Sequence, residues 1–119
     1  MEVEVLKRVE EALVSLDAEA FVSLYTDDFV FEDTSSGDTI TNKQELREWF
    51  ERLFSLPEVG FSNVTFFRCG DHGAGEWTWS GRSLGSGKEY SIKGASIFSL
   101  GEDEITSESI FYDPRKAFE

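Results

Sequence analysis

Among the side chains of this sequence, Asp33 is the carboxylate best placed to do acid–base chemistry in an apolar surround. Phe29, Phe31 and Asp33 have the same parity in the string FVFED. Because side chains alternate across a β-strand, Asp33 is expected to continue an apolar face. A carboxylate held in such a surround, where burial disfavours its charged form, is a candidate general base. A second interpretation stays open, in which Asp33 caps backbone amides in the turn-like string DTSSG.

Strand parity brings a second group of residues to the same expected face. In the segment 76–82, Trp77 and Trp79 oppose glutamate, hydroxyl and arginine side chains. Ser96 and three residues of the last predicted strand have the matching parity in their own segments. The residues that we expect to line one apolar ligand pocket with Asp33 are Trp77, Trp79, Ser96, Glu108, Ile110 and Tyr112.

Each of these residues also has a purely structural interpretation. Trp77 and Trp79 can stack on a planar ligand or simply fill the core. Glu108 can act as a second acid or form a salt bridge to a lysine or arginine at the rim. The hydroxyl of Tyr112 can donate to a ligand or to the protein. Ser96 can hydrogen-bond a ligand, but no histidine is placed to activate it as a nucleophile.

The remaining chemistry-bearing residues predict neither a metal nor a cofactor. Cys69 is the only cysteine, which excludes an intramolecular disulfide and a thiolate zinc site, and we expect a buried, inert thiol. His72 is the only histidine, and it falls in a predicted turn. The glycine-rich turns lack the helix and lysine of a phosphate-binding loop.

Composition limits the class of partner. The 119 residues include 24 acidic and 11 basic side chains, for a net charge of −13. Such a surface repels nucleic acid and anionic membranes, and no apolar run approaches the length of a membrane span. The first residues, MEVEVLKRVEE, lack the apolar core of a secretory signal, so a cytoplasmic protein is expected. The length suits one domain over residues 1–119.

The periodicity of apolar residues predicts helices first and strands afterwards. We expect a helix from Val3 to Leu16, a second that begins after Asp17, contains Leu24 and breaks at Asp27–Asp28, and a strand at 29–31. A third helix is capped by Thr41 or Asn42, carries an aromatic stripe and ends at Pro57. Strands are expected at about 59–69, 74–83, 88–100 and 104–112, separated by glycine-rich turns. This order predicts an α+β fold with helices on one face of an antiparallel sheet.

Several strings resemble a known family over essentially the whole chain. They are LYTDDFVFED (24–33), NKQELREWFERLF (42–54), GEWTWSG (75–81), SGKEYSIKGASIFSLGEDEI (86–105) and IFYDP (110–114). The chain resembles the nuclear-transport-factor-2-like superfamily, and within it the SnoaL-like polyketide cyclase group. The resemblance implies a cystatin-like cone, in which three N-terminal helices cover a strongly bent, mostly antiparallel sheet and a pocket opens at the wide end. It also implies a homodimer through the outer face of the sheet.

The catalytic positions of three related enzyme groups can be compared with this sequence. Asp33 falls on the stretch that resembles the one where ketosteroid isomerase keeps its aspartate base. That enzyme also needs two oxyanion donors, and the positions in this chain that resemble theirs are Val9 and Ser96, neither of which is the required acidic donor. Limonene epoxide hydrolase uses an Arg-x-Asp on its third strand and an aspartate on its last. The positions in this chain that resemble these three are Trp77, Trp79 and Ile110, so the water-activating triad is absent. Scytalone dehydratase relies on two pocket histidines, which this sequence does not supply.

Three hypotheses follow for the pocket. The first is a cofactor-free enzyme of the cyclase or isomerase type, which uses Asp33 as a general base on a small apolar carbonyl compound. The second is a non-catalytic module that binds a small apolar molecule. The third is a dimerisation domain whose interior is filled by its own side chains.

Overall fold

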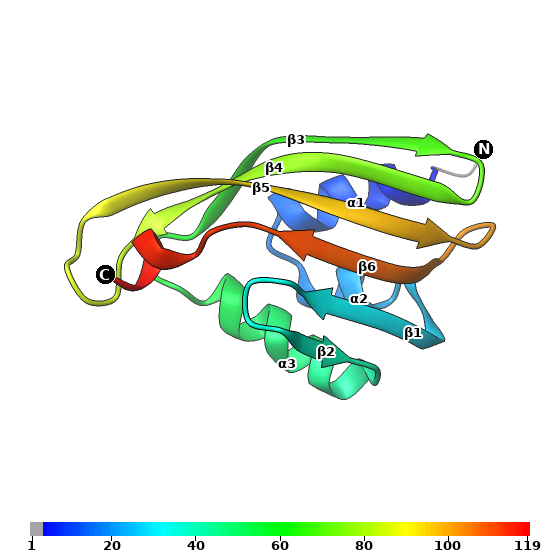
Figure 1. Cartoon of the computed structure of the whole chain (residues 1–119), viewed down its shortest axis with the longest axis horizontal. Helices are drawn as coiled ribbons and strands as arrows, with labels where there is room; N and C mark the ends of the chain where they lie inside the picture. Colours follow the sequence, from blue (N-terminus) through cyan, green and yellow to red (C-terminus); the bar gives the residue numbers. More distant parts are fainter. Residues whose placement is uncertain (1–3) are drawn as a thin grey trace.

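The computed structural model describes residues 4–119, which combine α-helices with one curved, unclosed β-sheet (Figure 1). The helices are α1 (Val5–Val14), α2 (Ala18–Val22) and α3 (Lys43–Phe54). The strands are β1 (Tyr25–Asp33), β2 (Asp38–Ile40), β3 (Gly60–Cys69), β4 (His72–Arg82), β5 (Glu89–Leu100) and β6 (Ile105–Phe111), and the 3-10 helix η1 (Arg115–Phe118) follows β6. The predicted α+β cone, with helices over a bent and mostly antiparallel sheet, is confirmed.

Side-chain caps start two of the helices where the sequence predicts them. Asp17 Oδ1 accepts a hydrogen bond from the Ala20 amide at 3.0 Å, at the start of α2. Asn42 Oδ1 accepts from the Glu45 amide at 2.9 Å, so Asn42 rather than Thr41 caps α3. Each cap satisfies one of the amides that the first helical turn leaves without a partner.

The ends of the first two helices differ from the prediction. α1 ends at Val14, because Leu16 has a φ of 57° and has left the helical conformation. Val3, where this helix was expected to begin, lies outside the described residues. The expected extension of the second helix to Asp27–Asp28 is wrong, since the chain from Tyr25 onward already pairs in the sheet as β1.

The sheet has the strand order β2-β1-β6-β5-β4-β3. Neighbouring strands are antiparallel except β1 and β6, which run parallel and bring residues 77 to 80 positions apart in the chain side by side. β2 was not predicted; it has three residues and pairs only with β1. In Figure 1, α1 and α2 lie behind the strands, and α3 runs beside the β1–β2 pair.

A bulge in β6 changes which of its residues face the core. Alternation predicts that Ile105 shares a face with Phe111, but Ile105 is fully buried while Phe111 is exposed. The register moves from Ser99↔Ser107 to Leu100↔Ile105, which leaves Thr106 as an extra residue in β6. An extra residue reverses parity on its far side, so Ile105 joins the buried face.

Two predictions about the β3–β4 connection are wrong. β4 begins at His72, which pairs with Cys69, so the histidine lies at the start of a strand rather than in the turn. Cys69 is exposed at the end of β3, where its thiol is not buried. In the described part of the chain, no helix has the length and hydrophobicity needed to cross a membrane.

Candidate functional site

Between the helices and the concave face of the sheet lies a small inner cavity of about 40 Å³. Helices α1, α2 and α3 contribute only apolar side chains to it, such as Phe21 and Phe50, and no lysine, arginine or histidine lines it. The cavity is far smaller than the roughly 300–1,000 Å³ of typical ligand pockets. Six residues from the predicted set line it together: Trp77, Trp79, Ser96, Glu108, Ile110 and Tyr112.

The position of Trp77 depends on the residue opposite it in the sheet. Trp77 in β4 pairs with Gly94 in β5, and a Cβ atom at residue 94 would overlap the six-membered ring of Trp77. Glycine therefore lets the indole lie flat across the neighbouring strand. From there the Trp77 Nε1–H donates to Ser96 Oγ at 2.9 Å, which gives both buried polar groups a partner.

Glu108 is the carboxyl group of the inner cavity. It is 4% exposed, and one of its oxygens, Oε1, accepts a hydrogen bond from the Tyr25 hydroxyl. Burial raises the pKa of Glu108 to about 7, although hydrogen bonds from Tyr25 and Ser96 pull in the opposite direction. The alternative of a salt bridge at the rim does not fit this buried position, where a tyrosine hydroxyl is the partner. Glu108 is therefore poised between its acid and its carboxylate near neutral pH.

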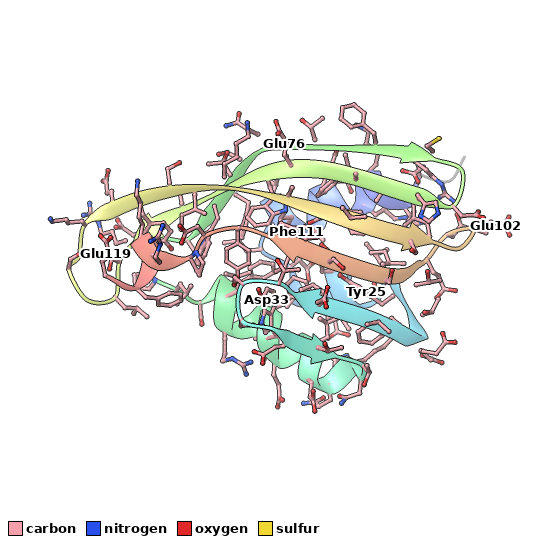
Figure 2. The ribbon with its side chains drawn as sticks, in the orientation of Figure 1. Tyr25, Asp33, Glu76, Glu102, Phe111 and Glu119 are labelled. Carbon is pink, nitrogen blue, oxygen red and sulfur yellow. The ribbon has the colours of Figure 1, made fainter. Side chains whose placement is uncertain are left out.

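Tyr25 is the member of this cluster that sequence reasoning missed. It lies at the opposite end of β1 from Asp33, as Figure 2 shows, and it is fully buried. Burial, followed by the charge of Glu108, raises the pKa of Tyr25 well above its usual range, so the tyrosine stays a hydrogen-bond donor. Its parity with Phe29, Phe31 and Asp33 was the available signal.

Asp33 lies outside the inner cavity, in an outer cleft of about 430 Å³. Its Oδ1 accepts from the Ser35 amide at 3.1 Å and from the Ser35 hydroxyl at 2.8 Å, while its Oδ2 accepts from the Tyr112 hydroxyl at 2.8 Å. The predicted capping contacts in the turn are thus present, and the carboxylate also lines a cleft of ligand size. The cleft is lined by Asp33, Ser35, Ser36, Asp38, Trp49, Arg52, Leu53, Leu56, Trp79, Tyr112 and Phe118.

The inner cavity and the outer cleft share a boundary. Trp49, Leu53, Trp79 and Tyr112 line both of them, so these four side chains lie between the cleft and the cavity. The ring of Tyr112 packs against those of Trp77 and Trp79, each at 5.9 Å between centroids. Burial and the neighbouring Asp33 carboxylate raise the pKa of Tyr112 well above its usual range, which keeps its hydroxyl protonated.

The described residues contain no group of three or more histidine, cysteine, aspartate or glutamate side chains that could hold a metal ion. The chemistry that this arrangement offers is proton transfer and hydrogen bonding. Asp33 and Tyr112 supply it at the cleft, and Glu108 with Tyr25 supplies it inside.

The sequence matches the profile of one protein family, described as the SnoaL-like domain, over residues 6–108. A search of curated proteins finds no match.

Solved structures share the fold at low sequence identity. A hypothetical protein with a ketosteroid isomerase-like fold from Catenulispora acidiphila, in complex with trimethylamine, superposes with a TM-score of 0.83 and 22% identity, over 98% of this chain and 91% of that one. A proposed polyketide cyclase from Pseudomonas putida has a TM-score of 0.79 and 16% identity, over 97% and 96%. A nuclear-transport-factor-2-like protein of unknown function from Cytophaga hutchinsonii has a TM-score of 0.74 and 18% identity, over the full length of both chains. These similarities establish the fold.

Proposed function

Because this chain belongs to the SnoaL-like domain family, we propose that it is a cofactor-free enzyme that moves a proton on a small apolar carbonyl compound. The general base of this proposal is Asp33, and the reaction is of the cyclase or isomerase type. The substrate lies in the outer cleft, against the aromatic side chains at its boundary with the inner cavity.

The observation that carries the proposal is the setting of Asp33. Asp33 is 4% exposed, yet it lines a cleft of about 430 Å³, which is within the size range of ligand sites. Ser35 holds Oδ1 through two donors, and Tyr112 holds Oδ2 through one. Because each carboxylate oxygen has two lone pairs, Oδ2 keeps one with which to accept a proton. The hydrogen bonds fix the base in place, as general base catalysis requires.

The fold neighbours add support for a small-molecule site. The similar Catenulispora acidiphila protein was obtained in complex with trimethylamine, a molecule of a few non-hydrogen atoms. Fold alone does not assign a reaction, so the choice of a carbonyl substrate rests on the base and on the apolar walls.

The proposal is tested by proton exchange at the carbon next to a carbonyl. 1-Tetralone, a flat ketone, would be incubated with the protein in D2O, and loss of the α-proton signal followed by NMR. Asp33→Asn should slow the protein-dependent exchange by about 100-fold or more, the usual contribution of a positioned base. The matched control is Asp28→Asn, which makes the same change at an exposed position of the same strand. Equal exchange rates for wild type and Asp33→Asn would contradict the assignment.

A second candidate function is non-catalytic binding of a small apolar molecule. The observation that favours it is the inner cavity, which at about 40 Å³ leaves little room to enclose a substrate. On this alternative Trp79→Ala, which removes a wall of the cleft, should weaken the affinity for 1-tetralone. Asp33→Asn should then leave that affinity almost unchanged.

We also propose that two copies associate through the outer face of the sheet. Phe67, Ile97 and Phe111 are 69%, 53% and 43% exposed, and Phe67 and Ile97 both pair with Ala74 in β4. Exposed apolar side chains in one patch favour self-association. Light scattering should report a dimer for the wild type and a monomer for Ile97→Lys. A wild type that stays monomeric across a series of increasing protein concentrations would overturn the proposal.

A further inference from the structure

The proposed reaction needs a second group that Asp33 cannot supply. When a base removes the proton next to a carbonyl, negative charge develops on the carbonyl oxygen, and donors aimed at that oxygen lower the barrier. As a carboxylate, Asp33 only accepts hydrogen bonds, and the Tyr112 hydroxyl already donates to it, so the carbonyl oxygen needs a donor elsewhere in the site.

Glu108 lies near Asp33, on the neighbouring strand of the sheet. In the parallel pair β1–β6, Asp33 is opposite Ile110 and Phe31 is opposite Glu108. Asp33 and Glu108 are therefore on neighbouring strands and on the same buried face, two residues apart along the strands. Two residues of a strand span about 6–7 Å. A ligand that enters through the outer cleft thus meets Asp33 first and Glu108 further in.

We infer that Glu108, in its protonated form, donates a hydrogen bond to the carbonyl oxygen of the ligand at the inner end of the site. This inference rests on the proposed function, because it completes the same reaction. The class of ligand it specifies has one oxygen acceptor at the end of an otherwise apolar body.

The size of the inner cavity fits one polar atom rather than a whole ligand. Its volume of about 40 Å³ exceeds the roughly 10–15 Å³ that a cavity needs to hold a water molecule, but it is far below that of a typical ligand pocket. A ligand oxygen can enter this space while the apolar body stays in the cleft of about 430 Å³. The two compartments meet at Trp49, Leu53, Trp79 and Tyr112, so the body would lie against aromatic and aliphatic walls.

Two hydroxyl groups, those of Tyr25 and Ser96, contact the carboxyl group of Glu108. Oε1 accepts from the Tyr25 hydroxyl. Oε2 can then carry the proton and donate it, since a protonated carboxyl group has one O–H. The Trp77–Ser96 hydrogen bond fixes the next polar group along the wall, and Ser96 also contacts Glu108. With its pKa at about 7, Glu108 is available as an acid below neutral pH.

Few other charged or titratable groups face Glu108. β1 contributes Tyr25 and β5 contributes the Ser96 hydroxyl, while Tyr112 follows β6 and lines the same cavity. The side chains that α1, α2, α3 and β3 present to the cavity are apolar. The protonation of Glu108 is therefore controlled by burial and by these neutral donors.

The step is balanced without an oxidant or a reductant. Asp33 takes the α-proton, so a C–H bond breaks and an O–H bond forms. The electron pair of the C–H bond becomes the carbon–carbon double bond of the enolate, and the carbonyl π electrons move to the oxygen. Glu108 donates its hydrogen bond to that oxygen, and reprotonation of carbon by Asp33 restores the base.

The test compares a ketone with a hydrocarbon of the same shape. The dissociation constants of 1-tetralone and of 1-methylenetetralin, in which CH2 replaces the oxygen, would be measured by tryptophan fluorescence at pH 5.5 and pH 8.5. The ketone should bind roughly tenfold more tightly at pH 5.5, where Glu108 is protonated, as expected for loss of one good hydrogen bond. The hydrocarbon should bind equally at both pH values.

Two variants distinguish hydrogen-bond donation by the Glu108 side chain from its packing in the cavity. Glu108→Gln should bind the ketone tightly at both pH values, because an amide N–H donates whatever the pH. Glu108→Met should remove the preference for the ketone. If Glu108→Met does not fold, the ketone affinity of Glu108→Gln at the two pH values still tests whether Glu108 donates the hydrogen bond. A wild-type profile that is the same for both probes, or a Glu108→Gln protein that keeps the pH dependence, would overturn the inference.

The same experiment distinguishes failure of the inference from failure of the proposed function. Asp33→Asn should keep the pH-dependent preference for the ketone while it loses α-proton exchange. If Asp33→Asn keeps the exchange and the preference, only the assignment of the base is wrong. If neither probe binds to the wild type, the small-molecule site is wrong and the role of Glu108 falls with it.

Discussion

The mouth of the site and its inner end each hold one carboxyl group, and the two groups are equally buried, at 4% exposure each. At the mouth, Asp33 accepts three hydrogen bonds, one from a backbone amide and two from the hydroxyls of Ser35 and Tyr112. At the inner end, Glu108 sits among apolar and aromatic side chains, with Tyr25 as the donor to one oxygen and a pKa of about 7. The donors are mostly local at the mouth and come from other strands inside.

This contrast shows that burial alone does not decide what a carboxyl group can do. For Glu108, burial raises the pKa and the hydrogen bonds from Tyr25 and Ser96 lower it, so both effects together set its proton affinity. The turn after β1 supplies donors to Asp33 from within three residues of the chain. Glu108 depends on Tyr25, 83 positions away, and therefore on the complete fold.

The largest expected effect concerns the inner carboxyl group and the pH dependence of folding. The pKa of Glu108 is about 7 in the folded protein and near 4.5 when unfolded, so the folded state holds this proton more tightly. The contribution to stability is complete below about pH 4.5 and is lost as the pH rises through about 7. Since one pKa unit corresponds to about 1.4 kcal/mol, the loss is on the order of 3 kcal/mol.

Urea unfolding at pH 5 and pH 8.5 would measure this loss. Glu108→Gln cannot lose a proton, so its stability should fall much less over the same interval. The matched control is Glu51→Gln, at an exposed position of α3, which should keep the wild-type difference. Repulsion within a chain of net charge −13 also varies with pH, but both variants share it. Parallel wild-type and Glu108→Gln curves would remove the contrast between the two carboxyl groups.

The next effect in size concerns backbone positions beside each group. A Cβ atom at Gly94 would overlap the ring of Trp77 in the inner wall, so Gly94→Ala should destabilise the fold by about 2 kcal/mol. At the mouth, Gly37 has open space around it but a φ of +80°. Gly37→Ala should cost only about 1 kcal/mol, from backbone strain. Urea unfolding of both variants checks the order, and a larger loss for Gly37→Ala would contradict it.

The sequence predicts the facing of side chains correctly where two strands pair without a bulge. Parity found Trp77, Trp79 and Ser96 because β4 and β5 pair without interruption from end to end. It failed for Ile105, where the bulge at Thr106 reverses the faces of β6. Alternation is a local rule, and the position of a bulge depends on the strands beside it.

Long-range pairing was beyond local patterns. Tyr25 was missed because Asp27 and Asp28 resemble a helix stop, whereas pairing with β6 draws the whole segment into a strand. The parallel contact between β1 and β6, which sets Glu108 two residues from Asp33, has no signature in either segment alone. Helix caps such as Asp17 and Asn42 were predictable, because they depend on residues only three positions apart.

The smallest expected effects are those of replacing Tyr112 at the mouth and Tyr25 at the inner end by phenylalanine. Tyr112→Phe removes one donor from Asp33, which keeps both donors of Ser35, so it should cost about 1 kcal/mol. It should leave unchanged the pH interval over which the stability contributed by Glu108 is lost, because Tyr112 is not the donor to Glu108. Tyr25→Phe is the matched variant of the inner end. The hydrogen bond from Tyr25 lowers the pKa of Glu108, so its removal should shift that interval to higher pH. Urea unfolding across pH 5–9 would show whether only Tyr25→Phe moves it. An equal shift in both variants would mean that Tyr112 acts on Glu108 as strongly as Tyr25 does, and that the mouth and the inner end do not have separate roles.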